Sequence, residues 1–184
     1  MVLFALYAIG SAMDPLKDSE DVKTWLSRFD EPLLGLAAGA AATVAIQSSS
    51  AMMGIVIALA GQQLISLEAG VAMMLGAEVG TCADTLVATI GRTAAAVRAG
   101  LYHLLFNLVS AGAGLALIGP LVALARLTGD ELPQQIANAH VAFNVIGAVV
   151  FIGFTGLAAT WLTRLVPDRA PDPPGRVVAR PRTT

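Results

Sequence analysis

Four hydrogen-bonding side chains stand together in an otherwise apolar part of the sequence, at Gln47-Ser48-Ser49-Ser50, and no charged residue occurs between Glu31 and Glu68. An amide or hydroxyl without a partner costs roughly 2–7 kcal/mol in hydrocarbon. Such a group is therefore tolerated in a membrane only where it lines a cavity, packs on protein or binds something. The hydroxyls, the amide and the free N–H groups of a helix end could bind an oxyanion, and the oxygens could bind a hard cation.

The charge balance around this motif favours an anion bound together with cations. No lysine or arginine occurs between Glu31 and Arg92, and a helix N-terminus supplies only about half a positive charge. Because that is too little for a doubly charged anion in a dry site, bound cations would have to supply the rest. We therefore expect cation-coupled anion transport, with serines that merely pack helices together as the alternative.

A second candidate site is the carboxylate of Glu78, which stands between Gly76 and Gly80 and is followed by Thr81. A charged carboxylate at the centre of a span costs about 2.5–3.5 kcal/mol, so it should face a cavity and a partner. We expect the helix to break over residues 76–82. Carboxylate, hydroxyl and backbone oxygens would then bind the coupling cation, which is sodium or a proton.

Two other arrangements of Glu78 stay open at this stage. Asp84, six residues further on, could share the ion only if the break folds the chain back. Alternatively, the Glu78 carboxylate could lie at a helix end near the membrane interface and pair with Arg92 or Arg98. In that case its role would be structural.

The composition indicates an all-α polytopic membrane protein. Of 184 residues, 56% are hydrophobic and 13% are charged, whereas soluble domains carry about 25% charged residues. A spanning helix needs about 20 apolar residues, which leaves room for roughly four to six membrane elements. The single cysteine, Cys82, excludes a disulfide framework within the chain.

We expect one membrane domain over residues 1–166 and a disordered, proline-rich tail over residues 167–184. The serine motif divides its apolar run into two segments that are each too short to span, which suits a re-entrant or broken-helix hairpin. The expected elements of the domain are an amphipathic interfacial helix (14–31), the broken hairpin (32–61), a second broken element (66–91) and two spanning helices (99–126 and 134–165). A solvated connector is the alternative for the amphipathic helix.

The two expected spanning helices repeat one polar pattern, a histidine and an asparagine four residues apart with a phenylalanine between them. The pattern occurs as His103, Phe106 and Asn107 and again as His140, Phe143 and Asn144. Residues four apart share one helical face. We interpret these histidines and asparagines as helix-packing residues that form interhelical hydrogen bonds, worth about 0.6 kcal/mol each. Direct contact with a substrate is the alternative.

The distribution of basic residues predicts the orientation of the chain. The tail carries four arginines between residues 169 and 182, which places the C-terminus in the cytoplasm. Arg92 and Arg98, two spans back, fall on the same side. The loop at 127–133 carries only acidic charges and would face outward.

Taken together, these motifs resemble the type II sodium-dependent phosphate cotransporters and their bacterial relatives. The resemblance covers roughly residues 5 to 167 and rests on four groups of residues: Ala12–Lys17, Thr43–Ala51, Gly76–Cys82 and the two histidine–phenylalanine–asparagine patterns. It implies sodium-coupled symport of inorganic phosphate in a bacterial inner membrane. It also implies ion transport without catalytic residues, without a cofactor other than the sodium ion, and without a nucleic-acid partner.

The chemistry of these motifs, together with the resemblance, predicts which residues form the site. The phosphate-binding residues would be Gln47, Ser48, Ser49 and Ser50, and the cation-binding residues Thr43, Gln47, Ser50, Glu78 and Thr81. Family members usually carry asparagine where Glu78 stands and often threonine or serine where Asp84 stands, which leaves sodium and proton both open as the coupling ion.

Family members contain two inverted repeats, each with its own glutamine–triple-serine element, and the substrate site lies between them. Only one such element occurs in this chain. The resemblance therefore implies one half of a transporter, which needs a second copy or a complementary half as its partner, in addition to phosphate, sodium and membrane lipid.

Two other classes of protein could use the same residues. An intramembrane serine hydrolase could combine one of the serines with His103 or His140, but the motif lacks the glycines that usually flank a nucleophile on a sharp turn. A non-transporting membrane assembly or regulatory subunit, derived from a transporter half, is the other alternative.

Overall fold

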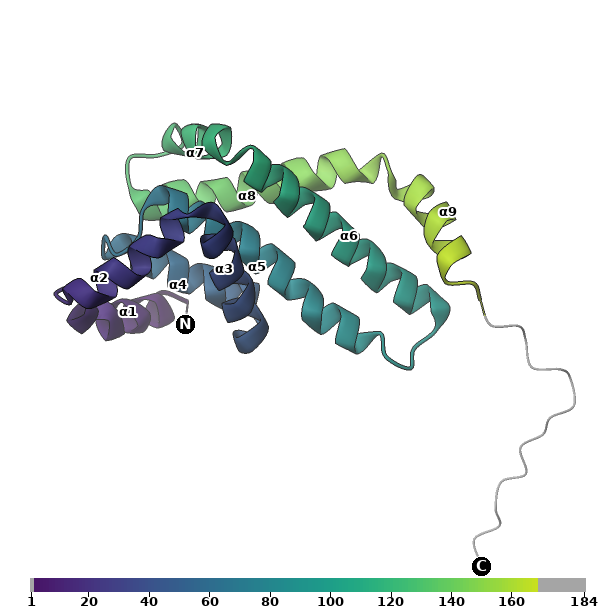
Figure 1. Ribbon diagram of the computed structural model, residues 1–184, viewed down its shortest axis with the longest axis horizontal. Helices are drawn as coiled ribbons and strands as arrows, with labels where there is room; N and C mark the ends of the chain where they lie inside the picture. The colour runs from purple at the N-terminus through teal and green to yellow at the C-terminus, as the bar shows by residue number, and fades with distance from the viewer. Residues whose placement is uncertain (1, 169–184) are drawn as a thin grey trace, which may run out of the picture.

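The computed structural model describes residues 2–168, which form helices and connecting turns without a strand. In chain order the helices are α1 (Val2–Met13), α2 (Glu20–Leu26), α3 (Pro32–Ile46), α4 (Ser49–Gly61), α5 (Leu67–Ala88), α6 (Ala94–Ala116), α7 (Ile118–Arg126), α8 (Leu132–Ile152) and α9 (Thr155–Leu165) (Figure 1). Two short 3₁₀ helices, Asp14–Leu16 and Ser27–Asp30, flank α2.

Among residues 2–168, three helices are long and apolar enough to cross a membrane: α5, α6 and α8, with 22, 23 and 21 residues. At 1.5 Å per residue they reach about 32–35 Å, which matches a hydrocarbon core of about 30 Å. The segment Glu20–Asp30 meets α3 at a bend of 107°, and this pair could form a fourth membrane element. The chain is therefore an all-α polytopic membrane protein, as its composition predicts.

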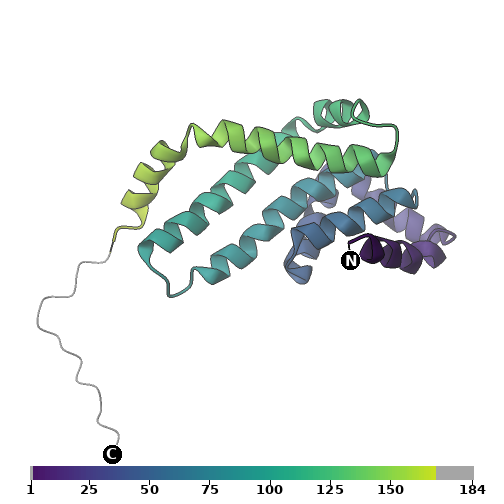
Figure 2. The same ribbon diagram turned by 180° about the vertical axis from the view of Figure 1, so that it is seen from behind.

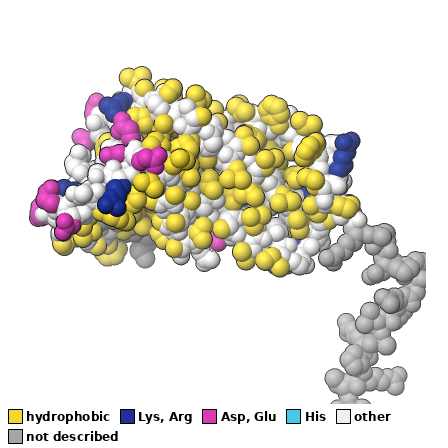
Figure 3. All heavy atoms as spheres, viewed as in Figure 1, with side chains coloured by type: hydrophobic (Ala, Val, Ile, Leu, Met, Phe, Trp, Pro, Cys, Tyr) yellow, Lys and Arg dark blue, Asp and Glu magenta, His cyan; other side chains and the backbone are white. Residues whose placement is uncertain are grey.

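Charged side chains gather at the two ends of the molecule, and apolar side chains cover the surface between them (Figure 3). At one end lie the acidic and basic residues around α2. At the opposite end, basic side chains are visible near the end of α9, where Arg164 lies in the last turn. Arg92 lies in the turn from α5 to α6. This arrangement suits a protein whose middle section lies in hydrocarbon.

Helix α5 is the centre of the fold. Every residue from Ala69 to Ala77 is buried, and α5 packs against α3, α4, α6, α7 and α8. Seen from behind, α8 crosses α6 at an angle and continues through a bend into α9, which packs against α6 (Figure 2). Among the described residues, the four largest fully buried side chains come from α4, α5 and α8: Met52, Met74, Leu75 and Ile136.

Glycines bring the backbones of α3 and α5 close together. A methyl group at Gly39 would overlap the backbone carbonyl of Met73, and a methyl group at Gly76 would overlap that of Leu36. A methyl group at Gly80 would likewise lie 2.7 Å from a backbone oxygen of α3. Small residues spaced in this way let membrane helices approach closely.

The predicted break over residues 76–82 is wrong, because α5 is one continuous helix from Leu67 to Ala88. Gly76 and Gly80 belong to the surface that contacts α3. Their missing side chains serve close packing, and the backbone between them keeps its helical hydrogen bonds. The expected element at 66–91 is therefore a single span.

The two predicted spanning helices at 99–126 and 134–165 are each interrupted. Helix α6 ends at Ala116 and α7 starts at Ile118, because Pro120 has no N–H to donate to the carbonyl four residues earlier and its ring would clash there. In the first turn of a new helix the missing N–H is harmless. Helix α8 ends before Gly153, and a turn in which the Phe154 N–H donates to the Phe151 carbonyl leads into α9.

The stretch expected as an amphipathic helix, 14–31, consists of α2 and its two flanking 3₁₀ helices. Leu26 is buried, whereas Trp25 is 56% exposed and packs edge-on against Phe29 with ring centroids 4.9 Å apart. Its place in a membrane interface stays a prediction. From Arg169 onward, the expected tail lies outside the described residues.

Candidate functional site

The polar motif forms the interruption between α3 and α4. Gln47 adopts a left-handed backbone conformation with φ of 58°, and its N–H donates to the Thr43 carbonyl at 2.7 Å. Ser48 is extended and caps α4, because its hydroxyl accepts a hydrogen bond from the Ala51 N–H at 3.2 Å. A left-handed residue followed by a serine cap ends one helix and starts the next.

Polar groups at this interruption are available to a ligand. Gln47 and Ser50 are exposed, and Ser48 and Ser49 are partly buried. The first N–H groups of a helix have no acceptor within it, and only that of Ala51 is capped by the serine hydroxyl. The motif therefore presents hydroxyls, an amide and backbone donors beside one another.

Thr43 lies one turn before the interruption and is 1% exposed. It faces Gly80 of α5, where an added methyl group would lie 2.7 Å from its Cβ. Within the described part of the chain, its buried hydroxyl oxygen has no hydrogen-bond partner. A buried hydroxyl without a partner is costly, and it could be satisfied by a bound ion.

The carboxylate of Glu78 is held by two side chains of α8. Its Oε1 lies 2.8 Å from His140 Nε2 and accepts a hydrogen bond from Asn144 Nδ2, also at 2.8 Å. The Glu78 side chain is only 13% exposed and that of His140 is 32% exposed. These contacts give the intramembrane carboxylate the partners that it needs.

The hydrogen bonds of Asn144 define how its amide is oriented. Its Nδ2 donates to Glu78 Oε1 and also to the His140 carbonyl, at 3.0 Å. Both of these atoms are acceptors, so the amide nitrogen rather than the amide oxygen must face them. The second histidine–asparagine pattern thus forms interhelical hydrogen bonds from α8 to α5.

The alternative in which Glu78 pairs with Arg92 or Arg98 is wrong. Glu78 lies in the middle of α5, with its partners on α8. The guanidinium of Arg98 instead donates to Asp168 at 2.8 Å and to the Val166 carbonyl at 3.3 Å. Because α5 is continuous, the chain also does not fold back to bring Asp84 beside Glu78.

The first histidine–asparagine pattern, on α6, is arranged differently. Asn107 is buried and its Nδ2 donates to the His103 carbonyl at 2.9 Å, within the same helix. The Cys82 thiol of α5 lies 3.9 Å from the same carbonyl. His103 Nδ1 is buried, and no hydrogen-bond partner for it occurs among residues 2–168. The same spacing therefore serves different contacts in the two helices.

The structure separates the predicted cation-binding residues into two groups. Gln47 and Ser50 lie at the α3–α4 interruption with Thr43 one turn before it, whereas Glu78 faces α8. The Thr81 hydroxyl donates to the Ala77 carbonyl of its own helix at 2.9 Å. Histidine, cysteine and acidic side chains form no cluster of three or more that could hold a metal ion within residues 2–168.

The sequence alone did not identify His140 and Asn144 as the partners of Glu78. The sequence did show that the Glu78 carboxylate and the two polar helix faces all needed hydrogen-bond partners. Whether the polar face of α6 or that of α8 meets Glu78 depends on how these helices cross α5. Residue spacing along the chain does not specify this crossing.

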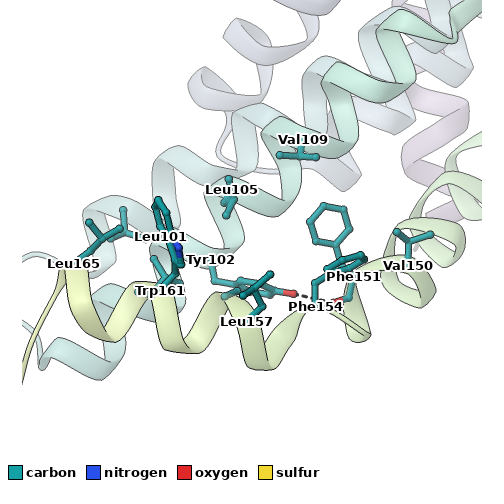
Figure 4. Close-up of a pocket in the computed structure, with 12 residues that line it drawn as sticks. Leu101, Tyr102, Leu105, Val109, Val150, Phe151, Phe154, Leu157, Trp161 and Leu165 are labelled. Carbon is teal, nitrogen blue, oxygen red and sulfur yellow. Dashed lines mark hydrogen bonds between the residues drawn. The ribbon is translucent and has the colours of Figure 1, made fainter.

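A groove of about 660 Å³ lies on the outside of the molecule between α6, α8 and α9. Its walls are almost entirely apolar, and Figure 4 shows the Tyr102 ring inside it with its hydroxyl turned to the Phe151 carbonyl, 3.3 Å away. Because the walls hold no cluster of hydrogen-bond donors, the groove does not suit phosphate. It is distinct from the polar motif and from Glu78.

Comparison with known proteins decides the family. The sequence pattern of the Na+/Pi-cotransporter family matches residues 1–159. The chain belongs to this family. The interruption at Gln47 and Ser48 and the Glu78 cluster both lie inside the matched region.

Three relatives are similar to this member of the Na+/Pi-cotransporter family. The uncharacterized protein YqeW of Bacillus subtilis is 28% identical over 88% of this chain and 52% of its own length. The putative inorganic phosphate export protein YjbB of Salmonella typhimurium is 24% identical over 91% of this chain and 31% of its own length. The human sodium-dependent phosphate transport protein 2C is 35% identical over 46% of this chain and 14% of its own length.

The chain spans about half the length of YqeW and a smaller share of the other two relatives. No solved structure matches it.

Proposed function

We propose that this chain takes part in sodium-coupled transport of inorganic phosphate across a membrane, with sodium as the coupling ion and no organic cofactor. Membership of the Na+/Pi-cotransporter family supports the proposal. The observation that carries it is the interruption at Gln47 and Ser48, which opens a helix N-terminus in a segment without a charged residue between Glu31 and Glu68.

Phosphate would bind at the start of α4. The backbone N–H groups of the first turn point out of the helix end, and the hydroxyls of Ser48, Ser49 and Ser50 add donors beside the Gln47 amide. These groups suit the oxygens of a phosphate ion. With no lysine or arginine between Glu31 and Arg92, the negative charge has to be balanced by bound cations.

Sodium would bind on the α3 side of the same interruption. The last carbonyls of a helix lack partners within it, and the Thr43 hydroxyl, the Gln47 amide oxygen and the Ser50 hydroxyl are further oxygen ligands. Such oxygens are the ligands that hard cations prefer. On α5, Glu78 with Thr81 nearby is a second candidate for the coupling cation, sodium or a proton.

The transporting unit would contain a second copy of this chain or a complementary half, in an inner membrane with the C-terminus in the cytoplasm. The lengths of the relatives support this proposal, since the chain spans 52% of YqeW. The exposed Gln47 and Ser50 support it as well, because exposed polar groups inside a bilayer require protein or water against them.

Transport fits the polar residues better than catalysis. His140 contacts Glu78 rather than a serine of the motif, and Ser48 uses its hydroxyl as a helix cap. A serine hydrolase would need a base within hydrogen-bond reach of its nucleophile.

The proposal is tested by phosphate uptake into vesicles that contain the full chain, alone and together with its complementary half where the same genome supplies one. We expect uptake that requires sodium and falls to background when choline replaces it. Phosphate binding without any sodium dependence would overturn the coupling. A correctly inserted protein that neither binds nor transports phosphate would instead support the alternative of a non-transporting subunit.

A further inference from the structure

We propose that the groove between α6, α8 and α9 is a binding site for an anionic phospholipid, with one acyl chain along the groove and the headgroup at Arg98 and Arg164. The inference goes beyond phosphate transport and does not depend on it. It concerns a surface that neither the polar motif nor Glu78 uses.

The walls of the groove suit a hydrocarbon chain. They are formed by leucine, valine and aromatic side chains, which include Leu105, Val109, Phe154 and Trp161. The walls carry two polar groups, the Tyr102 hydroxyl, which is paired with the Phe151 carbonyl, and the indole N–H of Trp161. An acyl chain from the bilayer would therefore fill an almost entirely apolar groove through van der Waals contacts.

The length and position of the groove fit one leaflet of a bilayer. Along α6 it extends from Leu101 to Val109, which is about 12 Å at 1.5 Å per residue. Half of a hydrocarbon core measures about 15 Å. The groove starts two turns from the N-terminal end of α6, at the end of the molecule where basic side chains gather, and runs from there toward the middle of the helix.

Two arginines lie near the groove at this end of the molecule, Arg98 near the start of α6 and Arg164 in the last turn of α9. Arg98 lines a depression that shares Tyr102 and Leu162 with the groove, and Arg164 lines a second depression that shares Ala159 and Thr163 with the first. The Arg98 guanidinium is held in place by Asp168 and by the Val166 carbonyl. It still has N–H groups to donate, since a guanidinium carries five.

The basic end favours an anionic headgroup over a zwitterionic one. Arginines bind phosphate groups through charge-assisted hydrogen bonds. Basic residues near a membrane surface attract anionic lipids. The groove thus has an apolar section for the chain and a basic section for the headgroup, in the order in which a phospholipid presents them.

Trp161 offers a direct test, because it lines the groove and the chain has only two tryptophans. In the Trp25→Phe variant of the full chain, Trp161 is the sole tryptophan reporter. The protein is placed in phosphatidylcholine vesicles that contain a small, equal fraction of brominated phosphatidylglycerol or brominated phosphatidylcholine. We expect the brominated phosphatidylglycerol to quench Trp161 fluorescence at least about twofold more strongly, which corresponds to the attraction of one basic residue or less.

Three variants make the test specific. Arg98→Gln combined with Arg164→Gln should make the two brominated lipids equally effective, whereas Arg28→Gln, an exposed arginine outside the groove, should keep the preference. In the Trp161→Phe variant, the remaining Trp25 should be quenched equally by both lipids. Circular dichroism confirms that each variant keeps its helices.

Equal quenching of Trp161 by both lipids would overturn the anionic headgroup site. Absence of quenching by either lipid would also overturn it, because another chain or a second copy would then cover the groove. Both measurements work whether or not the protein transports phosphate, so a failure here is distinguishable from a failure of the proposed transport.

Discussion

Glu78 is a carboxylate inside a membrane-spanning helix, and two side chains from one neighbouring helix hold it. Asn144 Nδ2 donates to its Oε1 at 2.8 Å, and His140 Nε2 lies 2.8 Å from the same oxygen. A carboxylate oxygen with two such contacts has fewer lone pairs left for a cation. Any cation that binds Glu78 in this arrangement would approach the other oxygen or displace a donor.

Replacement of Glu78 by glutamine tests its role as a ligand of the coupling cation. Glu78→Gln keeps the shape of the side chain and removes its charge. We expect the cation concentration for half-maximal uptake to rise about tenfold, as for the loss of a charged hydrogen-bonding group. The phosphate affinity at saturating cation should change much less. The measurement is uptake against sodium concentration and against pH, since the cation is sodium or a proton.

Unchanged dependence on both sodium and pH in Glu78→Gln would show that Glu78 is not the cation ligand. His103→Gln is a useful comparison, because His103 makes no hydrogen bond to Glu78 among the described residues. It tests whether the loss of any intramembrane polar group has the same effect.

Replacement of Ser49 or Ser50 by alanine tests the phosphate site. Each variant removes one hydroxyl at the start of α4 but leaves the Ser48 cap in place. A hydrogen bond to a charged ligand is worth about 1.5–3 kcal/mol, so phosphate affinity should fall by about tenfold or more. Equilibrium binding of radiolabelled phosphate in the presence of sodium measures this.

Ser110→Ala is the matched control for the serine variants. Ser110 is a buried serine of α6, and its hydroxyl has no hydrogen-bond partner in the described part of the chain. Its removal should leave phosphate affinity unchanged. If Ser49→Ala and Ser50→Ala both bind phosphate as tightly as this control, the phosphate site lies elsewhere.

At the scale of the helices, the contact between α3 and α5 determines where the polar motif lies. Gly35 and Gly39 on one helix and Gly76 and Gly80 on the other allow the backbones to meet. Thr43 and the interruption follow directly on the same face of α3. The glycines therefore hold the end of α3, and with it the motif, against α5.

Alanine at Gly76 should destabilise this contact. The added methyl group would overlap the Leu36 carbonyl, and backbone atoms cannot move aside as a flexible side chain can. Overpacking of this kind costs about 1–3 kcal/mol or more. Unfolding followed by circular dichroism in detergent should show a lower free energy of unfolding.

Gly112→Ala is the control for the packing prediction. Gly112 also lies in a spanning helix, but an added methyl group there meets nothing within 4 Å. Alanine favours helix over glycine by about 1 kcal/mol, so this variant should be as stable as the parent or more stable. If both glycine variants show equal stability, the close contact between α3 and α5 does not contribute to the fold.

At the scale of the whole molecule, much of the surface between the charged ends is apolar. Large side chains such as Val141, Val145 and Val149 of α8 are more than half exposed. In water a patch of this size would be unfavourable, whereas in hydrocarbon it is expected. The exposed polar motif is the part of this surface whose hydrogen-bonding groups lipid cannot satisfy.

We expect the chain to associate with a second copy or with a complementary half. Association covers Gln47 and Ser50, which are exposed in the single chain. Crosslinking in membranes and native mass measurement in mild detergent should detect a species of twice the mass or a complex with a second protein. A monomer that transports phosphate by itself would contradict this prediction.

The class of protein and the position of the polar interruption could both be predicted from the amino-acid sequence. Composition and segment length identify membrane helices, because hydrocarbon requires about 20 apolar residues per span. The end of α3 and the start of α4 follow from Gln47 and Ser48, since a serine cap acts on the N–H group three residues ahead, that of Ala51. These are local effects, and local effects can be inferred from neighbouring residues.

The role of the glycines around Glu78 and the contacts of Glu78 itself depend on how the helices pack. A glycine permits either a helix break or the close approach of another helix, and the same glycine pattern is compatible with both. The packing of α3 on α5 selects close approach at Gly76 and Gly80. Likewise, the pairing of Glu78 with His140 and Asn144 spans 62 and 66 residues. It depends on the path of α8 across α5, which helical spacing within either segment does not specify.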